Sequence, residues 1–263
     1  MQYLRPIRRS RIFASFAGLF ITVVALAAAA RTSQAALTDG GNGPQLLIGT
    51  DDDRQDNPAI QAGAATDQSL KRTDVLIGGR GNDVIFGLNG NDVIDGGQGQ
   101  DIILGGPDGG PAPGGPPNSD IMFGGQGDDV NLWAPGDGSE AFIGGPGRDA
   151  LIFGITDKEN GLPKLLPGVP GFPQGVPTAN VSGQPNFCTI EASPLPGYDH
   201  LIRFRSQAGN LIVTVRVRDV EQVFCSQDGG ITFADLTQPA PGFVNVSQND
   251  VLALNPLVGA MIR

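Results

Sequence analysis

Apolar residues in the middle of the chain recur in short runs at a constant spacing, separated by glycine-rich turns. From residue 78 to residue 104, three consecutive segments share a nine-residue pattern: GGRGNDVIF, GLNGNDVID and GGQGQDIIL. Each has six turn-forming residues followed by three that are typical of a strand. Segments at 118–123, 124–132, 135–143 and 144–152 keep parts of the pattern. A repeated turn and short strand predict a parallel solenoid, because one unit cannot bury its apolar face alone.

The sixth place of the repeat carries an acidic side chain. The series is Asp74, Asp83, Asp92, Asp101, Asp120, Asp129, Glu140 and Asp149. Stacked units bring these carboxylates together with no basic residue at a matching position, so a cation is the natural neutralising partner. Carboxylate and turn carbonyl oxygens suit Ca²⁺, which accepts many oxygen ligands in flexible geometry, better than Mg²⁺, which demands a strict octahedron.

These units resemble the RTX (hemolysin-type) calcium-binding repeat, GGxGxDxUx. The resemblance covers roughly a third of the chain. It implies an all-β fold, a right-handed parallel β-roll with two units per coil and Ca²⁺ held between turns of successive coils. On that arrangement Asp83, Asp101, Asp129 and Asp149 line one side, and Asp74, Asp92, Asp120 and Glu140 line the other. Glu140 departs from the motif. The implied metal-binding turns also include Gly79, Gly81, Gly90, Gly97, Gly99, Gly125, Gly127, Gly145 and Gly147.

Alternation within the strand triplets predicts which side chains point inward. The expected inward series is Ile85, Ile94, Ile103, Met122, Phe142 and Leu151. Asn131 interrupts this series, and we expect a local distortion there. The outward residues of the units with Asp83, Asp101, Asp129 and Asp149 are also apolar. A soluble protein rarely leaves such a face bare, so we expect the C-terminal domain, residues 188–263, or another copy of the chain to cover it.

The beginning of the chain has the pattern of a secretory signal peptide, residues 1–35. Four arginines within residues 5–11 precede the apolar run Ile12–Ala30, and small residues surround Ala35. The alternative is a retained membrane anchor, because the apolar run is nearly long enough to span a bilayer. Residues 36–73 are interpreted as an N-terminal cap that closes the open end of the solenoid, residues 74–154.

The net negative charge of the chain limits the kinds of molecule that it can be expected to bind. The chain has a formal net charge of -10, and residues 36–263 hold 12 basic and 27 acidic side chains. This balance argues against nucleic acid or an anionic membrane as a partner and fits the uptake of calcium ions. The predicted location is secreted, extracellular or at the cell surface. The sequence does not indicate an oligomeric state.

The rest of the chain predicts a linker and a second β region. Residues 155–187 are rich in proline and glycine and form a linker or an extended arm over a surface. Residues 188–263 alternate apolar and polar side chains, typical of a small antiparallel β domain. Cys188 and Cys225 are the only cysteines, and in an exported chain they predict a disulfide. The apolar segment Leu257–Ile262 is expected to dock onto the roll.

No catalytic motif emerges from the sequence. His200 is the single histidine, so the two-histidine HExxH zinc motif is absent, and no GxSxG nucleophile elbow is present. A triad of His200, Asp199 and a serine is formally available, but a loop histidine beside an aspartate is usually inert. We therefore predict a secreted, non-enzymatic calcium-binding protein whose folding depends on the metal. The alternative is a cell-surface adhesin or matrix protein, with the roll as a spacer and the C-terminal domain binding a surface or matrix ligand.

Overall fold

The structure is a computed structural model, and it describes residues 37–39, 41–48, 74–88, 91–106, 120–159, 162–182 and 185–262. The predicted signal peptide, most of the predicted cap and Gly90 lie outside these residues. The described part is nearly all β-structure, as the sequence predicted, and it also contains two short helices that were not predicted. Within it, no helix has the length and apolar character needed to cross a membrane.

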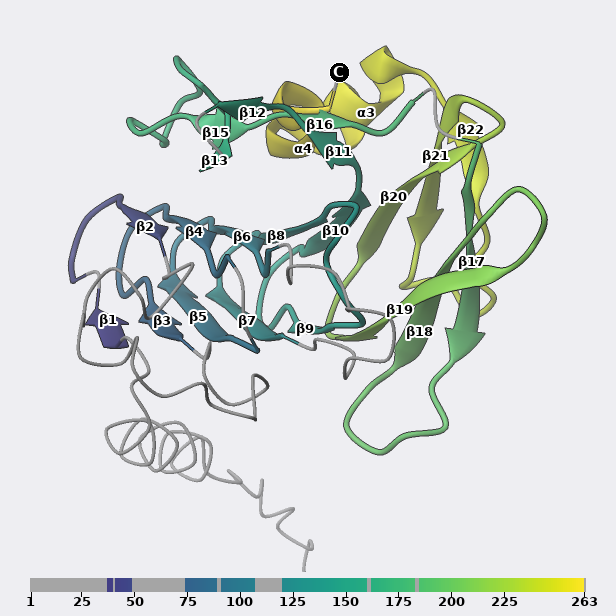
Figure 1. The fold of residues 1–263 in the computed structure, drawn as a ribbon, viewed down its shortest axis with the longest axis horizontal. Helices are drawn as coiled ribbons and strands as arrows, with labels where there is room; N and C mark the ends of the chain where they lie inside the picture. Colours follow the sequence, from purple (N-terminus) through teal and green to yellow (C-terminus); the bar gives the residue numbers. More distant parts are fainter. Residues whose placement is uncertain are drawn as a thin grey trace, which may run out of the picture.

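Two sheets of eight strands each form the body of the protein (Figure 1). We call them sheet A and sheet B. In order across the sheet, sheet A contains β1 (Leu37–Asp39), β3 (Val75–Ile77), β5 (Val93–Gln98), β7 (Ile121–Gln126), β9 (Ala141–Ile143), β19 (Leu211–Arg218), β18 (His200–Arg205) and β17 (Phe187–Ala192). Sheet B contains β2 (Leu46–Ile48), β4 (Val84–Phe86), β6 (Ile102–Leu104), β8 (Val130–Trp133), β10 (Ala150–Phe153), β20 (Gln222–Gln227), β21 (Gly230–Asp235) and β22 (Val244–Val246).

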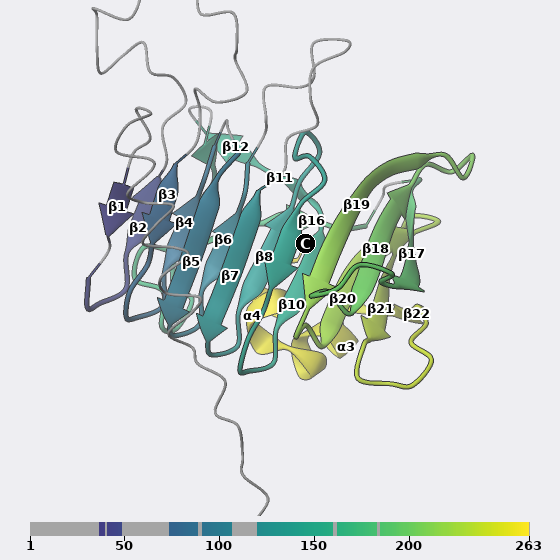
Figure 2. The same ribbon diagram turned by 90° about the horizontal axis from the view of Figure 1, so that it is seen from below.

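The repeat region is a parallel β-roll with two units per coil. Successive units alternate between the sheets, so β3, β5, β7 and β9 pair in parallel in sheet A, and β4, β6, β8 and β10 do so in sheet B. Figure 2 shows the strands of sheet A side by side from below. Where the repeats are uninterrupted, the nine-residue period sets the register, since Val84 pairs with Ile102, two units later. Equivalent strands still pair across the longer spacing that follows, since Ile102 pairs with Val130.

The space between the sheets is filled by the residues predicted to point inward. Ile85, Ile94, Ile103, Met122, Phe142 and Leu151 are all fully buried in one cluster. Toward the C-terminal strands this core becomes aromatic, where the rings of Phe153 and Phe204 stack at 5.3 Å and Trp133 packs against both. The irregularity expected at Asn131 is found on one side only: the pairing of β8 with β6 ends at Asn131, whereas β8 stays in register with β10 through Trp133. Asn131 is buried in the core and donates from Nδ2 to Sδ of Met122 at 2.9 Å.

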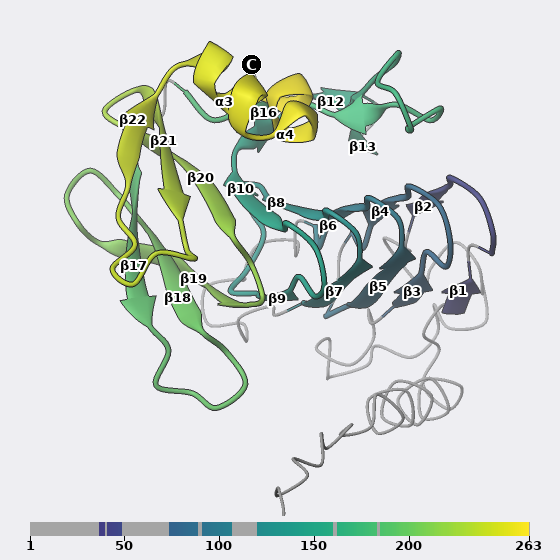
Figure 3. The same cartoon turned by 180° about the vertical axis from the view of Figure 1, so that it is seen from behind.

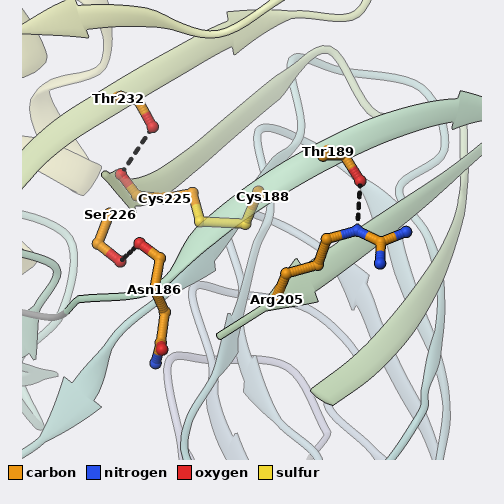
Figure 4. Close-up of a disulfide and its surroundings, with 7 residues drawn as sticks. All are labelled: Asn186, Cys188, Thr189, Arg205, Cys225, Ser226 and Thr232. Atoms are coloured by element: carbon orange, nitrogen blue, oxygen red, sulfur yellow. Dashed lines mark hydrogen bonds between the residues drawn. A yellow bond between two sulfur atoms is a disulfide. The ribbon is translucent and has the colours of Figure 1, made fainter. Parts of the chain in front are cut away.

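The strands after residue 186 extend both sheets of the roll. Strand β19 pairs in parallel with β9, and β20 pairs in parallel with β10, while the remaining C-terminal strands add antiparallel. The predicted boundary at residue 188 is therefore not a break in hydrogen bonding. Cys188 of β17 and Cys225 of β20 form the predicted disulfide, which joins sheet A to sheet B (Figure 4).

The apolar outer face of sheet B is covered, as its composition predicted. Its residues Val84, Phe86, Ile102, Leu104, Val130, Leu132, Ala150 and Ile152 are at most 3% exposed. Two segments cover it, as Figure 3 shows from behind. One is the proline-rich arm, with β11 (Ile155–Thr156), β12 (Lys158–Glu159), β13 (Leu162–Pro163), β14 (Leu165–Leu166), β15 (Val176–Pro177) and β16 (Ala179–Asn180). The other is the helix pair α3 (Gln248–Leu254) and α4 (Pro256–Met261).

The C-terminal segment docks as expected, although as helices. Asn255 begins α4 by accepting the N–H of Val258 at 3.1 Å, and Pro256 follows at the first helical position. Its Nδ2 donates to Oε1 of Gln222 in β20 at 2.9 Å. Leu257, Val258 and Met261 then pack among the buried residues of the outer face of sheet B.

Candidate metal centre

The turns of the roll gather the sixth-place acids into two lines. Each of these residues directly precedes a strand, so alternation of the strands between sheets sorts the acids by sheet. Asp83, Asp101, Asp129 and Asp149 precede sheet B strands and form the first line. Asp74, Asp92, Asp120 and Glu140 precede sheet A strands and form the second line. All eight are at most 2% exposed.

One carboxylate oxygen of each stacked aspartate accepts a backbone hydrogen bond from the aspartate of the preceding coil. In the first line, the N–H of Asp83 donates to Oδ1 of Asp101, that of Asp101 to Asp129, and that of Asp129 to Asp149, each at 2.8 Å. In the second line, Asp74 donates to Asp92 at 2.8 Å and Asp92 to Asp120 at 2.7 Å. The backbone register is therefore fixed by the same side chains that carry the negative charge.

The other carboxylate oxygen has no such role. Within the described part of the chain, Oδ2 of Asp83, Asp101, Asp129 and Asp149 is buried and has no hydrogen-bond partner, and the same holds for Asp120. A buried polar atom is costly unless it is paired, and a buried charge is more so. A repeated series of such oxygens fits a bound cation.

Main-chain oxygens face these carboxylate oxygens across the first glycine of each unit. A Cβ on Gly96 would lie 2.5 Å from both Oδ2 of Asp101 and the carbonyl oxygen of Gly124. A Cβ on Gly124 would lie 2.5 Å from Oδ2 of Asp129 and 2.7 Å from the carbonyl oxygen of Gly144. The absence of a side chain at these glycines leaves a cradle between two hard oxygen donors, which is the chemistry that Ca²⁺ prefers.

Burial disfavours the ionised form of the aspartates in the two lines, because protein atoms alone do not compensate their charge. It raises the pKa of Asp101 to about 7, that of Asp149 to about 8 and that of Asp129 to about 9. Hydrogen bonds from the backbone act in the opposite direction, and neighbouring carboxylates raise the pKa values further. Ionised aspartates at neutral pH therefore need a positive partner.

The glycines of the implied metal-binding turns adopt conformations and contacts that a side chain would not allow. Those with positive φ are Gly79, Gly81, Gly97, Gly99, Gly125, Gly127 and Gly145. Gly147 does not have a positive φ, but a Cβ on this residue would collide with the carbonyl of Gly127. The turns thus stack closely enough for their carbonyls to contact the next coil.

The second line is less regular at its C-terminal end. Glu140 replaces aspartate, and a Cβ on Gly105 would meet both Oδ2 of Asp120 and Oε1 of Glu140. Asp137, which the sequence did not single out, is buried nearby and accepts the N–H of Ala134 at 2.7 Å. Burial and Asp137 raise the pKa of Asp120 to about 7. The first line is therefore the more uniform of the two.

Side chains alone do not complete a metal site here. In the described ranges, no three acidic, histidine or cysteine side chains converge on one point. Each metal ion would be held by carboxylates together with main-chain carbonyls of the turns. Calcium accepts six to eight oxygens of both kinds.

Sequence reasoning missed two residues at the C-terminal end of the first line. The N–H of Asp149 donates to Oε2 of Glu221 at 2.7 Å, and the carbonyl oxygen of Asp219 lies against Gly144. The only available signal was an acid directly before an apolar strand in EQVF, residues 221–224, without the glycines of the repeat.

Comparisons with known proteins agree with the repeat pattern. The family model of the RTX calcium-binding nonapeptide repeat matches four copies in residues 72–103 and 118–130. Comparison with curated proteins finds no match. RTX repeats bind calcium, and the oxygen cradles of the first line fit that ion.

Proposed function

We propose that this chain, whose residues 72–130 carry RTX calcium-binding repeats, is a secreted, non-enzymatic protein in which calcium binding between stacked turns is coupled to folding. The observation that carries the proposal is the series of buried, unpartnered Oδ2 atoms of Asp101, Asp129 and Asp149 in the described chain. Two of these atoms face main-chain carbonyls of the next coil, across Gly96 and Gly124.

Coupling to folding follows from the way in which the sites are built. The carboxylates of one line lie 18 to 28 residues apart in sequence, so they come together only when the coils stack. Without calcium, the stacked state must hold several buried carboxylates, whose raised pKa values report the cost of ionising them. Binding energy in such a site is folding energy. Extracellular calcium modules bind with dissociation constants of about 10⁻⁴ to 10⁻³ M, so we expect affinities in that range.

Export is supported by features at both ends of the chain. The N-terminal residues have a secretory pattern in sequence. The disulfide between Cys188 and Cys225 is typical of oxidising compartments. We place the protein outside the cytoplasm on these grounds.

A non-enzymatic role is supported by the surroundings of His200. The residue lies in β18, paired with Ala192 and Val217 in the sheet. The Asp199 carboxylate, its nearest acid in sequence, accepts the N–H of Asp219 at 3.0 Å and so stabilises a turn. Asp199 therefore has a structural role that needs no catalytic partner.

Calcium titration of the purified protein tests this proposal. Isothermal titration calorimetry should detect saturable binding, and chelation with EDTA should reduce the β signal in circular dichroism and expand the chain in solution scattering. Asp101→Ala and Asp129→Ala should weaken binding, whereas Asp228→Asn, in an exposed turn remote from the lines, should not. A compact metal-free form with an unchanged spectrum would contradict the coupling.

A second candidate function is adhesion to an anionic surface or matrix polymer. The outward side of β18 and β19 carries Arg203, Arg205, Arg216 and Arg218, a basic row in an acidic protein. Glu191 pairs with Arg203 at 2.9 Å and with Arg205 at 3.7 Å, and Asp219 pairs with Arg218 at 3.3 Å, so only Arg216 of the row lacks an ion pair among the described residues. Binding to an acidic polysaccharide but not to a neutral one, with loss of binding in Arg203→Gln/Arg216→Gln, would support adhesion. Equal binding to the acidic and the neutral polysaccharide would contradict the adhesion proposal.

A further inference from the structure

The roll contains one more coil than its repeats encode. Arg216, Val217 and Arg218 of β19 pair with Ala141, Phe142 and Ile143 of β9. After a short turn, Gln222, Val223 and Phe224 of β20 pair with Ala150, Leu151 and Ile152 of β10. The turn at residues 219–221 therefore crosses from sheet A to sheet B directly over the last repeat turn, residues 144–149.

Glu221 takes the place of the next sixth-place aspartate in this coil. The N–H of Asp149 donates to Oε2 of Glu221 at 2.7 Å, as the N–H of Asp129 donates to Oδ1 of Asp149 at 2.8 Å. Like the repeat aspartates, Glu221 directly precedes a strand of sheet B. The longer side chain reaches the same position from a shorter turn.

Asp219 supplies the main-chain oxygen of the same cradle. A Cβ on Gly144 would collide with the carbonyl oxygen of Asp219 and with Oδ2 of Asp149. This matches Gly124, whose Cβ would meet Oδ2 of Asp129 and the carbonyl oxygen of Gly144. Asp149 is fully buried, and its Oδ2 has no hydrogen-bond partner within the described residues. An unpartnered carboxylate oxygen therefore points into a space bounded by a second oxygen donor.

We propose that this junction is a further calcium site, in which Oδ2 of Asp149, the carbonyl oxygen of Asp219 and the carboxylate of Glu221 hold one ion. The proposal rests on calcium binding by the roll. The ion would fasten the C-terminal strands to the last repeat, at the point where the repeat sequence stops. Asp219 contributes only its carbonyl, because its carboxylate pairs with Nε of Arg218 at 3.3 Å.

The junction is expected to be the weakest site of the first line. Its turn has three residues, whereas the repeat turn beneath it has six, so fewer carbonyl oxygens surround the ion. The positive charge of Arg148 also acts on Glu221 and would be repelled by a bound cation. A purely structural alternative is that Glu221 only accepts the N–H of Asp149, with Arg148 as its counter-charge.

Glu221→Gln separates these alternatives, because glutamine keeps an oxygen for the N–H of Asp149 but removes the charge. We expect calorimetry to show one calcium ion fewer than in the wild type. Asp228→Asn, in an exposed turn, serves as a control and should keep the wild-type stoichiometry. An unchanged stoichiometry in Glu221→Gln would overturn the proposal. A wild-type protein that binds no calcium at all would instead overturn the function on which it rests.

Hydrogen exchange gives a second readout that localises the site. Calcium should slow exchange in the wild type in the repeats, residues 96–106 and 120–132, and in the junction, residues 216–224. In Glu221→Gln the protection of residues 96–106 and 120–132 should remain, while the calcium-dependent protection of residues 216–224 should be lost. Loss of protection in both regions would show that the two regions respond to calcium as one unit, and it would overturn a separate junction site. Calcium-dependent protection of residues 216–224 that persists in Glu221→Gln would also overturn the site.

Discussion

The N–H of Asp149 donates to Oε2 of Glu221 at 2.7 Å, although 72 residues separate the two in sequence. This contact joins the last repeat to a segment that has no repeat sequence. It continues a ladder in which each acid accepts from the coil before it. The C-terminal strands are therefore bound to the roll by the same type of hydrogen bond that joins the coils to each other.

Replacing Asp129 by asparagine should have opposite effects with and without calcium. Burial and the adjacent carboxylates of Asp101 and Asp149 raise the pKa of Asp129 to about 9, so its ionised form destabilises the metal-free fold. Asparagine keeps an oxygen for the N–H of Asp101, and it places an uncharged amide opposite the carbonyl of Gly144, across Gly124. The melting temperature without calcium should rise. Calcium affinity should fall roughly tenfold, which corresponds to about 1.4 kcal/mol.

Thermal unfolding by circular dichroism, in calcium-free buffer and at saturating calcium, measures both effects. Asp228→Asn is the matched control, since it makes the same change in an exposed turn. A change of the same sign in both conditions would show that Asp129 acts only as a structural hydrogen-bond acceptor.

The repeat region was predictable because its period determines both its strands and its acids. The inward series from Ile85 to Leu151 and the two lines of acids follow from alternating sheets and from counting nine residues, with the count restarted at Asp120 and at Glu140, where the spacing changes. Glu221 was not predictable in this way, because its turn lacks glycines and has a different length. The extension of both sheets by β19 and β20 depends on long-range strand pairing, which local sequence does not encode. The burial of Asn131 was not predictable either: its Nδ2 donates to Met122, a contact visible only in three dimensions, while its Oδ1 has no partner among the described residues.

Without calcium, the folded protein should lose stability as the pH rises from about 5 to 9. Burial raises the pKa values of Asp101, Asp149 and Asp129 to about 7, 8 and 9, above the value near 3.8 expected in the unfolded chain. The folded state therefore holds more protons over this range, and the free energy of unfolding falls with increasing pH. Saturating calcium should reverse the trend, since the ion binds deprotonated carboxylates. Melting curves at pH 5, 7 and 9 in metal-free and calcium-loaded buffers test both signs. A metal-free melting temperature that rises with pH would contradict this account.

Close stacking of the turns predicts a large penalty for Gly97→Ala. Gly97 has a φ of 102°, and a Cβ there would collide with the carbonyl of Gly79 in the preceding coil. Gly209 has a φ of 83° but no atom within 4 Å of such a Cβ, so Gly209→Ala isolates the cost of the backbone conformation. We expect about 1 to 2 kcal/mol for Gly209→Ala and a clearly larger loss for Gly97→Ala. Urea unfolding in the presence of calcium measures the difference. Equal losses would mean that the coils can separate to admit a methyl group.

The helix pair should stabilise the fold by covering the outer face of sheet B. Met261 in α4 is fully buried among the apolar residues of that face, whereas Leu252 in α3 is 52% exposed. Met261→Ala should lower the free energy of unfolding by about 2 to 5 kcal/mol, because it leaves a cavity against the sheet. Leu252→Ala should change it by about 0.5 kcal/mol or less, as is usual for exposed positions. Urea unfolding of the two variants at saturating calcium makes the comparison. If Met261→Ala proved as mild as Leu252→Ala, the helices would be dispensable for the roll, and the arm alone would have to protect Phe86 and its neighbours from water.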